Sequence, residues 1–246
     1  MFYKTGENNH GLPHDPFKVA TLFLDQTTIP RAIGWISTTA ADGTHNLAPY
    51  SQFTNVSFDP PTVIFSAHEL VGIGRKDTVN NIEETGVFCW QLATYTLREA
   101  VNMSAEAVGP SVDEFDRAKL EKTWSQSLAT PVPMVAASPV RFECEYLQTI
   151  RLPGSPPMGT VDLIIGRVVG VYIDDSVLTN GRIDVRKAMP IARLGYYEYA
   201  VVKDSFDMII PGEERTLVGL AGERSQSQPN KESIEKNDGK ETAELG

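Results

Sequence analysis

Residues 31–53 read RAIGWISTTAADGTHNLAPYSQF. The segment 31–39 is rich in β-forming residues and predicts a strand. The pair Asp42-Gly43 that follows is typical of a tight turn between antiparallel strands, so a hairpin is expected. A second strand region covers 46–58 and is expected to end at 59–61, where two prolines cannot donate hydrogen bonds to a strand ladder.

The rest of the chain adds strands and short helices to this hairpin. The continuously apolar run at 62–66 predicts a strand buried on both faces, and residues 140–146 alternate apolar and charged side chains as a half-buried strand does. Strands separated by turns, with only short helices between them, indicate a closed or nearly closed antiparallel barrel. Further strands are expected at 87–93, 160–173 and 196–202, and further helices at 77–85, 96–105 and 112–124.

Both ends of the chain are expected to lie outside the barrel domain, which we place at 29–210. Residues 1–28 are rich in Gly, Pro and Asn, which favours an irregular leader. Residues 211–246 are expected to form a disordered polar tail, because from Gly222 onward no aromatic residue is present. Such a segment cannot bury enough apolar surface to offset the entropy of ordering it.

Composition narrows the class of protein. Of the 246 residues, 41% are hydrophobic, which is enough for a sizeable core, and Cys89 and Cys144 are expected to be buried and unpaired. The net charge of −10 argues against nonspecific binding to nucleic acid. The N-terminus has no apolar signal region, and the longest apolar stretch, 163–173, is too short to cross a membrane. A soluble cytoplasmic protein is therefore expected.

Several motifs for catalysis and metal binding are incomplete. The segment 72–74 lacks the third glycine of a dinucleotide-binding GxGxxG, and neither a phosphate-binding GxxxxGK[ST] nor a GxSxG motif is present. His68-Glu69 does not continue to HExxH, so no metal site is expected. A Ser-His-Asp triad stays open, because geometry rather than sequence order defines it.

Three polar stretches, at 35–38, 46–55 and 75–78, combine hydroxyls, amides and cations beside strand or helix ends. The last one begins the helix expected at 77–85, with Asp77 or Thr78 as its N-cap and Gly86 placed to end it. A helix N-terminus presents free N–H groups and partial positive charge, which suit a phosphate, and Lys76 adds a full charge. Each stretch taken alone also fits an ordinary strand edge or helix start.

In combination these stretches closely resemble the flavin reductase-like (flavoredoxin-type) family. The resemblance spans roughly residues 18–205 and implies an FMN-binding split β-barrel, a mainly β, Greek-key antiparallel barrel with a few short helices. It also implies that FMN lies at the interface of a homodimer. The segments that carry it are RAIGWIST at 31–38, NLAPYS at 46–51 with Phe53 and Asn55, VSFDPP at 56–61, KDT at 76–78 with Asn81-Ile82 and Thr85-Gly86, and RLGYYEY at 193–199.

The resemblance further implies which residues hold the flavin. Trp35, Ser37 and Thr38 would line it, and Arg193 would lie close to it. Departures from the family pattern are Gln52, where relatives have an aromatic or small residue, and Tyr196, which replaces a second glycine. The ring and ribityl chain would contact Ala48, Pro49, Tyr50, Ser51 and Phe53, and the ribityl-phosphate end would contact Ser66, Lys76, Asp77 and Thr78.

The implied activity is that of an NAD(P)H-dependent flavin oxidoreductase. Electrons would pass from NADH or NADPH through FMN to a flavin or another small-molecule acceptor, and no side chain is expected to be catalytic because the cofactor carries the chemistry. The alternative is a non-catalytic FMN-binding electron carrier or flavin store, which the sequence barely separates from a reductase. A pyridoxamine phosphate oxidase or haem binder is a third interpretation. The insertion at 95–139 is expected to cover the flavin site or the dimer interface.

Overall fold

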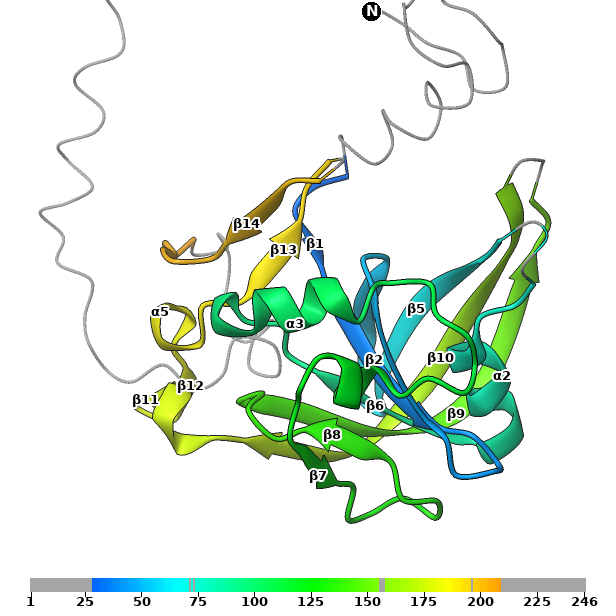
Figure 1. Ribbon diagram of the computed structural model, residues 1–246. Coiled ribbons are helices and arrows are strands. Elements are labelled where there is room, and N and C mark those ends of the chain that lie inside the picture. The colour runs from blue at the N-terminus through cyan, green and yellow to red at the C-terminus, as the bar shows by residue number, and fades with distance from the viewer. Residues whose placement is uncertain (1–27, 71, 73, 155–157, 196, 209–246) are drawn as a thin grey trace, which may run out of the picture. The chain divides into compact units, whose positions relative to one another are not determined.

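The computed structural model describes residues 28–70, 72, 74–154, 158–195 and 197–208 (Figure 1). The described residues up to Ser205 form one compact unit, and every described strand and helix lies in it. The expected leader at 1–28, apart from residue 28, and the expected tail at 211–246 lie outside the described residues. No helix in the described ranges combines the length and the hydropathy that crossing a bilayer requires.

The body of this unit is a seven-stranded sheet in which every neighbouring pair is antiparallel. Its strands are Gly34–Thr39 (β2), His45–Tyr50 (β3), Phe53–Phe58 (β4), Pro61–Leu70 (β5), Val87–Gln91 (β6), Val140–Leu152 (β9) and Met158–Ile173 (β10). Their order in the sheet is β3-β2-β6-β9-β10-β5-β4. The consecutive strands β3 and β4 therefore lie at opposite ends of the sheet.

Smaller sheets and short helices surround this body. A three-stranded sheet contains Arg31–Ala32 (β1), Ile191–Arg193 (β13) and Tyr199–Val201 (β14). Two-stranded sheets pair Lys122–Trp124 (β7) with Pro133–Val135 (β8) and Leu178–Thr179 (β11) with Arg182–Ile183 (β12). The α-helices are Asp77–Thr85 (α2), Arg98–Met103 (α3), Glu114–Arg117 (α4) and Val185–Ala188 (α5), and the 3₁₀ helices are Tyr95–Leu97 (η1) and Asp175–Val177 (η2).

Side chains of β2 divide between two hydrophobic cores because successive residues of a strand point to opposite faces. Ile36 lies in the core enclosed by the large sheet, where α2 contributes Val79 and Ile82. Trp35 lies in a second core on the other face, together with Phe115 of α4. The sheet therefore has a layer packed on each side of β2, with α2 on one side and α3 and α4 on the other.

The two ends of the sheet meet through aromatic rings. Tyr50 at the end of β3 packs on Phe65 of β5, with ring centroids 5.0 Å apart. Phe53, the first residue of β4, stacks on Trp90 of β6 at 5.4 Å and an interplanar angle of 4°. A Cβ placed at Gly34 would lie only 2.9 Å from the Cβ of Phe53. Closure of the barrel at this point therefore requires the bare backbone of glycine.

The hairpin and the first helix are confirmed. Strands β2 and β3 pair in continuous register across the turn, where Gly43 has a φ of 88°. Helix α2 covers 77–85 as predicted, and Gly86 ends it in the left-handed conformation. The predicted N-cap is wrong by one residue or more, because Lys76 occupies that position and no side chain caps the helix.

Two expectations around the insertion are wrong. The helix expected at 112–124 is reduced to α4, because Lys119 has a φ of 55° and the chain then enters β7. Strand β9 does not alternate between buried and exposed side chains, since Arg141 and Glu143 are buried. The insertion covers them: Arg141 Nη1 donates to the carbonyl of Ala136 at 2.8 Å, and Glu143 accepts from backbone N–H groups of the insertion.

We predict that Gly34→Ala lowers the free energy of unfolding by about 1–3 kcal/mol, the usual cost of overpacking a core. The added methyl would collide with the Cβ and ring of Phe53, which cannot move without losing its stack on Trp90. Gly109→Ala is the control, because a Cβ there meets nothing within 4 Å. Urea unfolding measures both, and equal stabilities for the two variants would contradict the packing argument.

Candidate functional site

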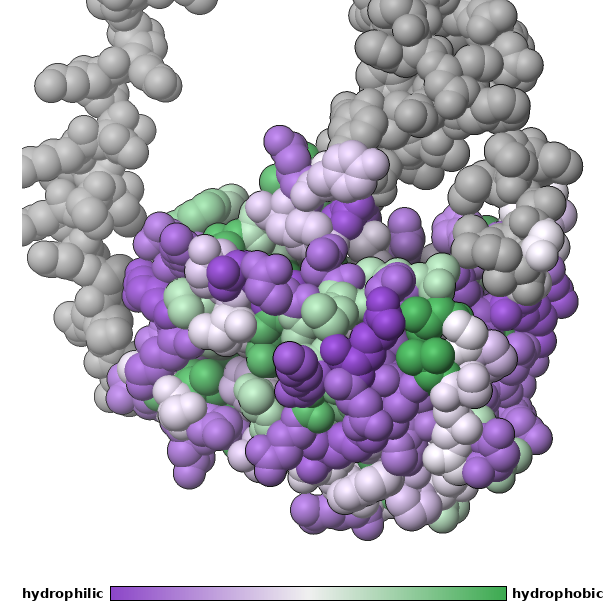
Figure 2. Space-filling view, viewed as in Figure 1, coloured by the Kyte–Doolittle hydropathy of each residue, from purple (hydrophilic) through white to green (hydrophobic). Residues whose placement is uncertain are grey.

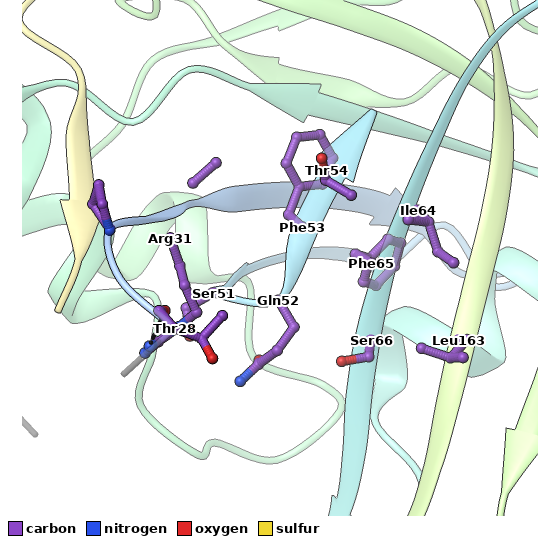
Figure 3. A pocket seen from close by; sticks show the side chains of 12 residues that line it. Thr28, Arg31, Ser51, Gln52, Phe53, Thr54, Ile64, Phe65, Ser66 and Leu163 are labelled. Atoms are coloured by element: carbon purple, nitrogen blue, oxygen red, sulfur yellow. Dashed lines mark hydrogen bonds between the residues drawn. The ribbon is translucent and has the colours of Figure 1, made fainter. Parts of the chain in front are cut away.

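A cavity of about 540 Å³ opens beside the turn between β3 and β4 (Figure 3). This volume falls within the range of small-molecule pockets. Phe53, Phe65, Ile64 and Leu163 give it an apolar wall, and hydroxyl and amide side chains form its rim. The full lining is Thr28, Pro30, Arg31, Ala32, Ser51, Gln52, Phe53, Thr54, Ile64, Phe65, Ser66 and Leu163.

Strand pairing fixes the polar rim of this cavity. The backbone N–H of Ser66 donates to the carbonyl of Gln52 at 3.0 Å, which ties the β3–β4 turn to β5. Ser66 and Leu163 are register partners in the β5–β10 ladder, so their side chains share one face. Arg31 completes the rim from β1, and its guanidinium donates to the carbonyls of Thr28 and Leu194, each at 3.0 Å.

The three polar stretches singled out from the sequence meet at helix α2. The side-chain amide of Asn46 donates to Thr78 Oγ1 at 2.7 Å, and that of Asn81 donates to Thr38 Oγ1 at 3.0 Å. Burial raises the pKa of Tyr50 well above its ordinary value, and its hydroxyl also hydrogen-bonds with Thr78. Segments that are distant in sequence are thus held together around the start of α2.

Arg75 positions the chain just before that helix. Its Nε donates to Asp162 Oδ2 of β10 at 3.0 Å, and its two terminal nitrogens donate to Glu83 at 2.7 and 2.8 Å. These hydrogen bonds lower the pKa of Glu83 and raise that of Arg75. The adjacent Lys76 therefore follows an anchored residue, and the N-terminus of α2 that it begins has no side-chain cap.

His68 follows Ser66 along β5, outside the lining of the cavity. It lies two residues beyond Ser66 and therefore on the same face of the strand. Its Nδ1 is buried and has no hydrogen-bond partner among the residues that the structure describes. Burial lowers the pKa of the ring, which keeps it neutral at pH 7. A buried polar atom without a partner is suited to meet a polar group of a ligand.

Three of the predicted flavin-binding residues line the cavity: Ser51, Phe53 and Ser66. Trp35 lies in the second core instead, and Ser37, two residues along β2, is buried on the same face. Trp35 Nε1 donates to Ser104 Oγ at 2.9 Å, and Ser37 Oγ donates to the Pro133 carbonyl at 2.6 Å. These two side chains hold the insertion against β2. Their predicted contact with a flavin stays a prediction.

The remaining predicted residues do not line the cavity. Ala48 packs on the core inside the barrel, and Pro49 is the register partner of Trp35. Arg193 is the register partner of Arg31, and its Nη1 donates to the hydroxyl of Tyr199 at 2.6 Å. Sequence reasoning missed Arg31 and His68 as site residues. Within the described ranges, no group of three or more metal-binding side chains occurs.

The family model described as "Flavin reductase like domain" matches residues 26–201, which is more than half of the chain. The chain belongs to the flavin reductase-like family. Its fold is the mainly β split barrel of that family, as the sequence predicts. The larger cavity and the start of α2 both lie inside the matched range.

Individual relatives agree with this assignment. The uncharacterized protein YwrF of Bacillus subtilis is 33% identical over 190 residues, which cover 76% of this chain and 91% of YwrF. The structure of nitrilotriacetate monooxygenase component B from Bacillus cereus is 31% identical with a TM-score of 0.72, over 81% of this chain and 100% of that chain. Flavoredoxin of Desulfovibrio vulgaris shares the fold, with a TM-score of 0.62 and 19% identity over 74% of this chain and 91% of its own.

We predict that Arg75→Ala lowers the free energy of unfolding by about 1–3 kcal/mol at pH 7, because buried Asp162 loses its hydrogen-bonded cation and keeps only Arg151, whose Nε lies 3.7 Å from Oδ1. Arg75 also holds the pKa of Glu83 below its ordinary 4.5, so that part of the stabilisation is present above pH 4.5 and is lost as the pH falls. The difference between wild type and variant should therefore shrink between pH 5 and pH 3.

Arg117→Ala provides the control for this measurement. Arg117 pairs with an exposed glutamate, Glu106, and exposed pairs contribute at most about 1 kcal/mol. Urea unfolding at pH 7, 5, 4 and 3 compares the two variants. Equal losses for both variants, or a difference for Arg75→Ala that grows in acid, would contradict the anchoring role.

Proposed function

We propose that the protein is an NAD(P)H-dependent flavin oxidoreductase that binds FMN and passes electrons to a flavin or another small-molecule acceptor. The observation that supports this most is the lining of the larger cavity, which combines aromatic and apolar walls with the hydroxyls of Ser51 and Ser66. Lys76 stands at the start of a helix whose N-terminus no side chain caps. A flavin mononucleotide has groups to match: an apolar ring, a polar chain and a phosphate.

The residues present fit each part of that molecule. Phe53 and Leu163 offer an apolar wall for the ring, and Ser51 and Ser66 offer hydroxyls for its polar edge. Lys76 and the first N–H groups of α2 suit the phosphate. In a chain with a net charge of −10, such a local cation is needed to hold an anionic group against the overall field.

When bound, FMN supplies the electron-transfer chemistry itself. The task of the chain is then to bind and orient the flavin and the nicotinamide. Hydride transfer between these two rings depends on their alignment more than on acid or base groups. Phe53 is held rigidly by its stack on Trp90, so it fixes one wall of the cavity. Neutral His68 would act as a hydrogen-bonding group and not as a charge.

Steady-state oxidation of NADH and NADPH with added FMN tests the proposed activity. Turnover with either donor supports the reductase, which we place in the cytoplasm, where both donors are available. Negligible turnover with both, while FMN still binds, would overturn the reductase and favour the electron carrier or flavin store.

We further propose a homodimer in which the partner covers the outer face of β9, β10 and β5. Ile150 and Leu163 are register partners on this face, and Leu152 lies two residues from Ile150 on the same side. Ile150 and Leu152 remain 42% and 43% exposed. Since Ile64 and Leu163 also line the cavity, a partner here would bury an exposed apolar surface and add a wall to the flavin site.

We predict that Lys76→Ala weakens FMN binding about tenfold or more, because a charge-assisted hydrogen bond to phosphate contributes about 1.5–3 kcal/mol. Lys187→Ala is the control, since Lys187 lies in α5 and donates to the Leu178 carbonyl. Quenching of flavin fluorescence gives both dissociation constants. Unchanged affinity in Lys76→Ala would remove this lysine from the site.

We predict that Ile150→Glu shifts the protein from dimer to monomer, because a carboxylate would be buried at the proposed interface without a partner. Ile183→Glu places the same charge on a similarly exposed isoleucine of β12, where 44% of the residue is accessible, and should leave the dimer intact. Sedimentation velocity distinguishes the species. A monomeric wild type, or two variants with the same behaviour, would contradict the interface.

A further inference from the structure

A second cavity, of about 280 Å³, lies between α3 and the hairpin of β13 and β14, which run side by side in Figure 1. Tyr95, Tyr197 and Tyr199 line it, and the buried side chains of Val101 and Ile191 belong to its lining as well. Figure 2 views the molecule from the side of α3 and β14, where hydrophobic side chains form small separate patches among hydrophilic ones. An aromatic cavity on such a face is a local feature and not part of a broad apolar surface.

Cations lie over the aromatic rings of this cavity. The Arg98 guanidinium is 4.3 Å from the centroid of the Tyr95 ring, and Lys203 Nζ is 5.9 Å from the same centroid. The Arg193 guanidinium is 4.8 Å from the Tyr199 ring. Three cations therefore lie over tyrosine rings of this cavity, although the net charge of the protein is −10.

We propose that this cavity binds an aromatic carboxylate, a single planar ring that carries one carboxyl group. The tyrosine rings supply stacking surface for the ligand's ring. With about half the volume of the first cavity, 280 against 540 Å³, the space suits one ring better than the three fused rings of a flavin.

Arg98 is the group best placed to meet the carboxylate. Its Nη1 donates to the Tyr95 carbonyl at 2.8 Å, and its Nε lies 3.4 Å from Glu99. A guanidinium has five N–H donors, so others remain for a ligand, and arginine pairs with carboxylates through two parallel hydrogen bonds. Glu99 competes weakly for this charge because its side chain is 80% exposed to water.

This site is separate from the proposed flavin cavity, and the proposal does not rest on flavin binding. The two cavities have no lining residue in common. They are linked through the three-stranded sheet, where Arg31 lines the first cavity and its register partner Arg193 lies over Tyr199 of the second. An acid bound here would therefore lie across β13 from the first cavity.

Isothermal titration of benzoate into the full-length protein without flavin tests the proposal. Cyclohexanecarboxylate keeps the charge and removes the aromatic ring, and benzamide keeps the ring and removes the charge. Benzoate should bind at least tenfold more tightly than either. Equal affinity for cyclohexanecarboxylate would overturn the stacking role of the tyrosines. Equal affinity for benzamide would overturn the role of the cations. If benzoate does not bind at millimolar concentration, the whole site is overturned.

Single-residue variants test whether benzoate binds in this cavity. Arg98→Gln should weaken benzoate binding at least fivefold, whereas Arg167→Gln, which removes an exposed arginine of β10 paired with Glu145, should leave it unchanged. Tyr197→Ala should also weaken it, and that residue is 93% exposed, so its loss cannot disturb the core. Wild-type affinity in both cavity variants, or displacement of benzoate by saturating FMN, would overturn the assignment to this cavity.

Discussion

The close approach of Phe53 to the bare backbone of Gly34 is the contact on which the rest of the structure depends. It brings the start of β4 against β2 and Trp90, and so joins the two ends of a sheet whose strand order separates β3 from β4. The same ring then forms a wall of the larger cavity. One side chain, Phe53, therefore serves both closure of the barrel and the ligand site. A substitution that weakens closure of the barrel also alters the cavity.

Where local chemistry determines the conformation, the sequence predicts it well. The Asp42-Gly43 turn, the prolines at 60–61 and the glycine after α2 each act within a few residues, and the hairpin and the helix follow from them. The conformation of the insertion at 95–139 depends instead on contacts with residues far away in the sequence. Its short α4 packs on β3, where the backbone N–H of Leu47 donates to Glu114, and its β7 strand pairs with β8. Buried Arg141 and Glu143 of β9 also bind insertion backbone, and no local sequence pattern reveals these contacts.

The candidate site likewise contains residues that the sequence predicts and residues that it misses. The resemblance to the family leads to Ser51, Phe53 and Ser66 at the cavity and to Lys76 at the helix start. Strand alternation shows that Trp35 and Ile36 face opposite sides of β2, but it does not say which side carries a ligand. His68 is missed for a related reason, since the missing partner of its Nδ1 becomes visible only when the neighbouring strands are in register.

One measurement tests the central claim most directly: a crystal structure of the protein grown with saturating FMN. This account predicts electron density for the ring between Phe53 and Ser66, and for the phosphate within hydrogen-bonding distance of Lys76 at the start of α2. Density for the flavin at another surface, or no flavin in this cavity at saturation, would contradict it.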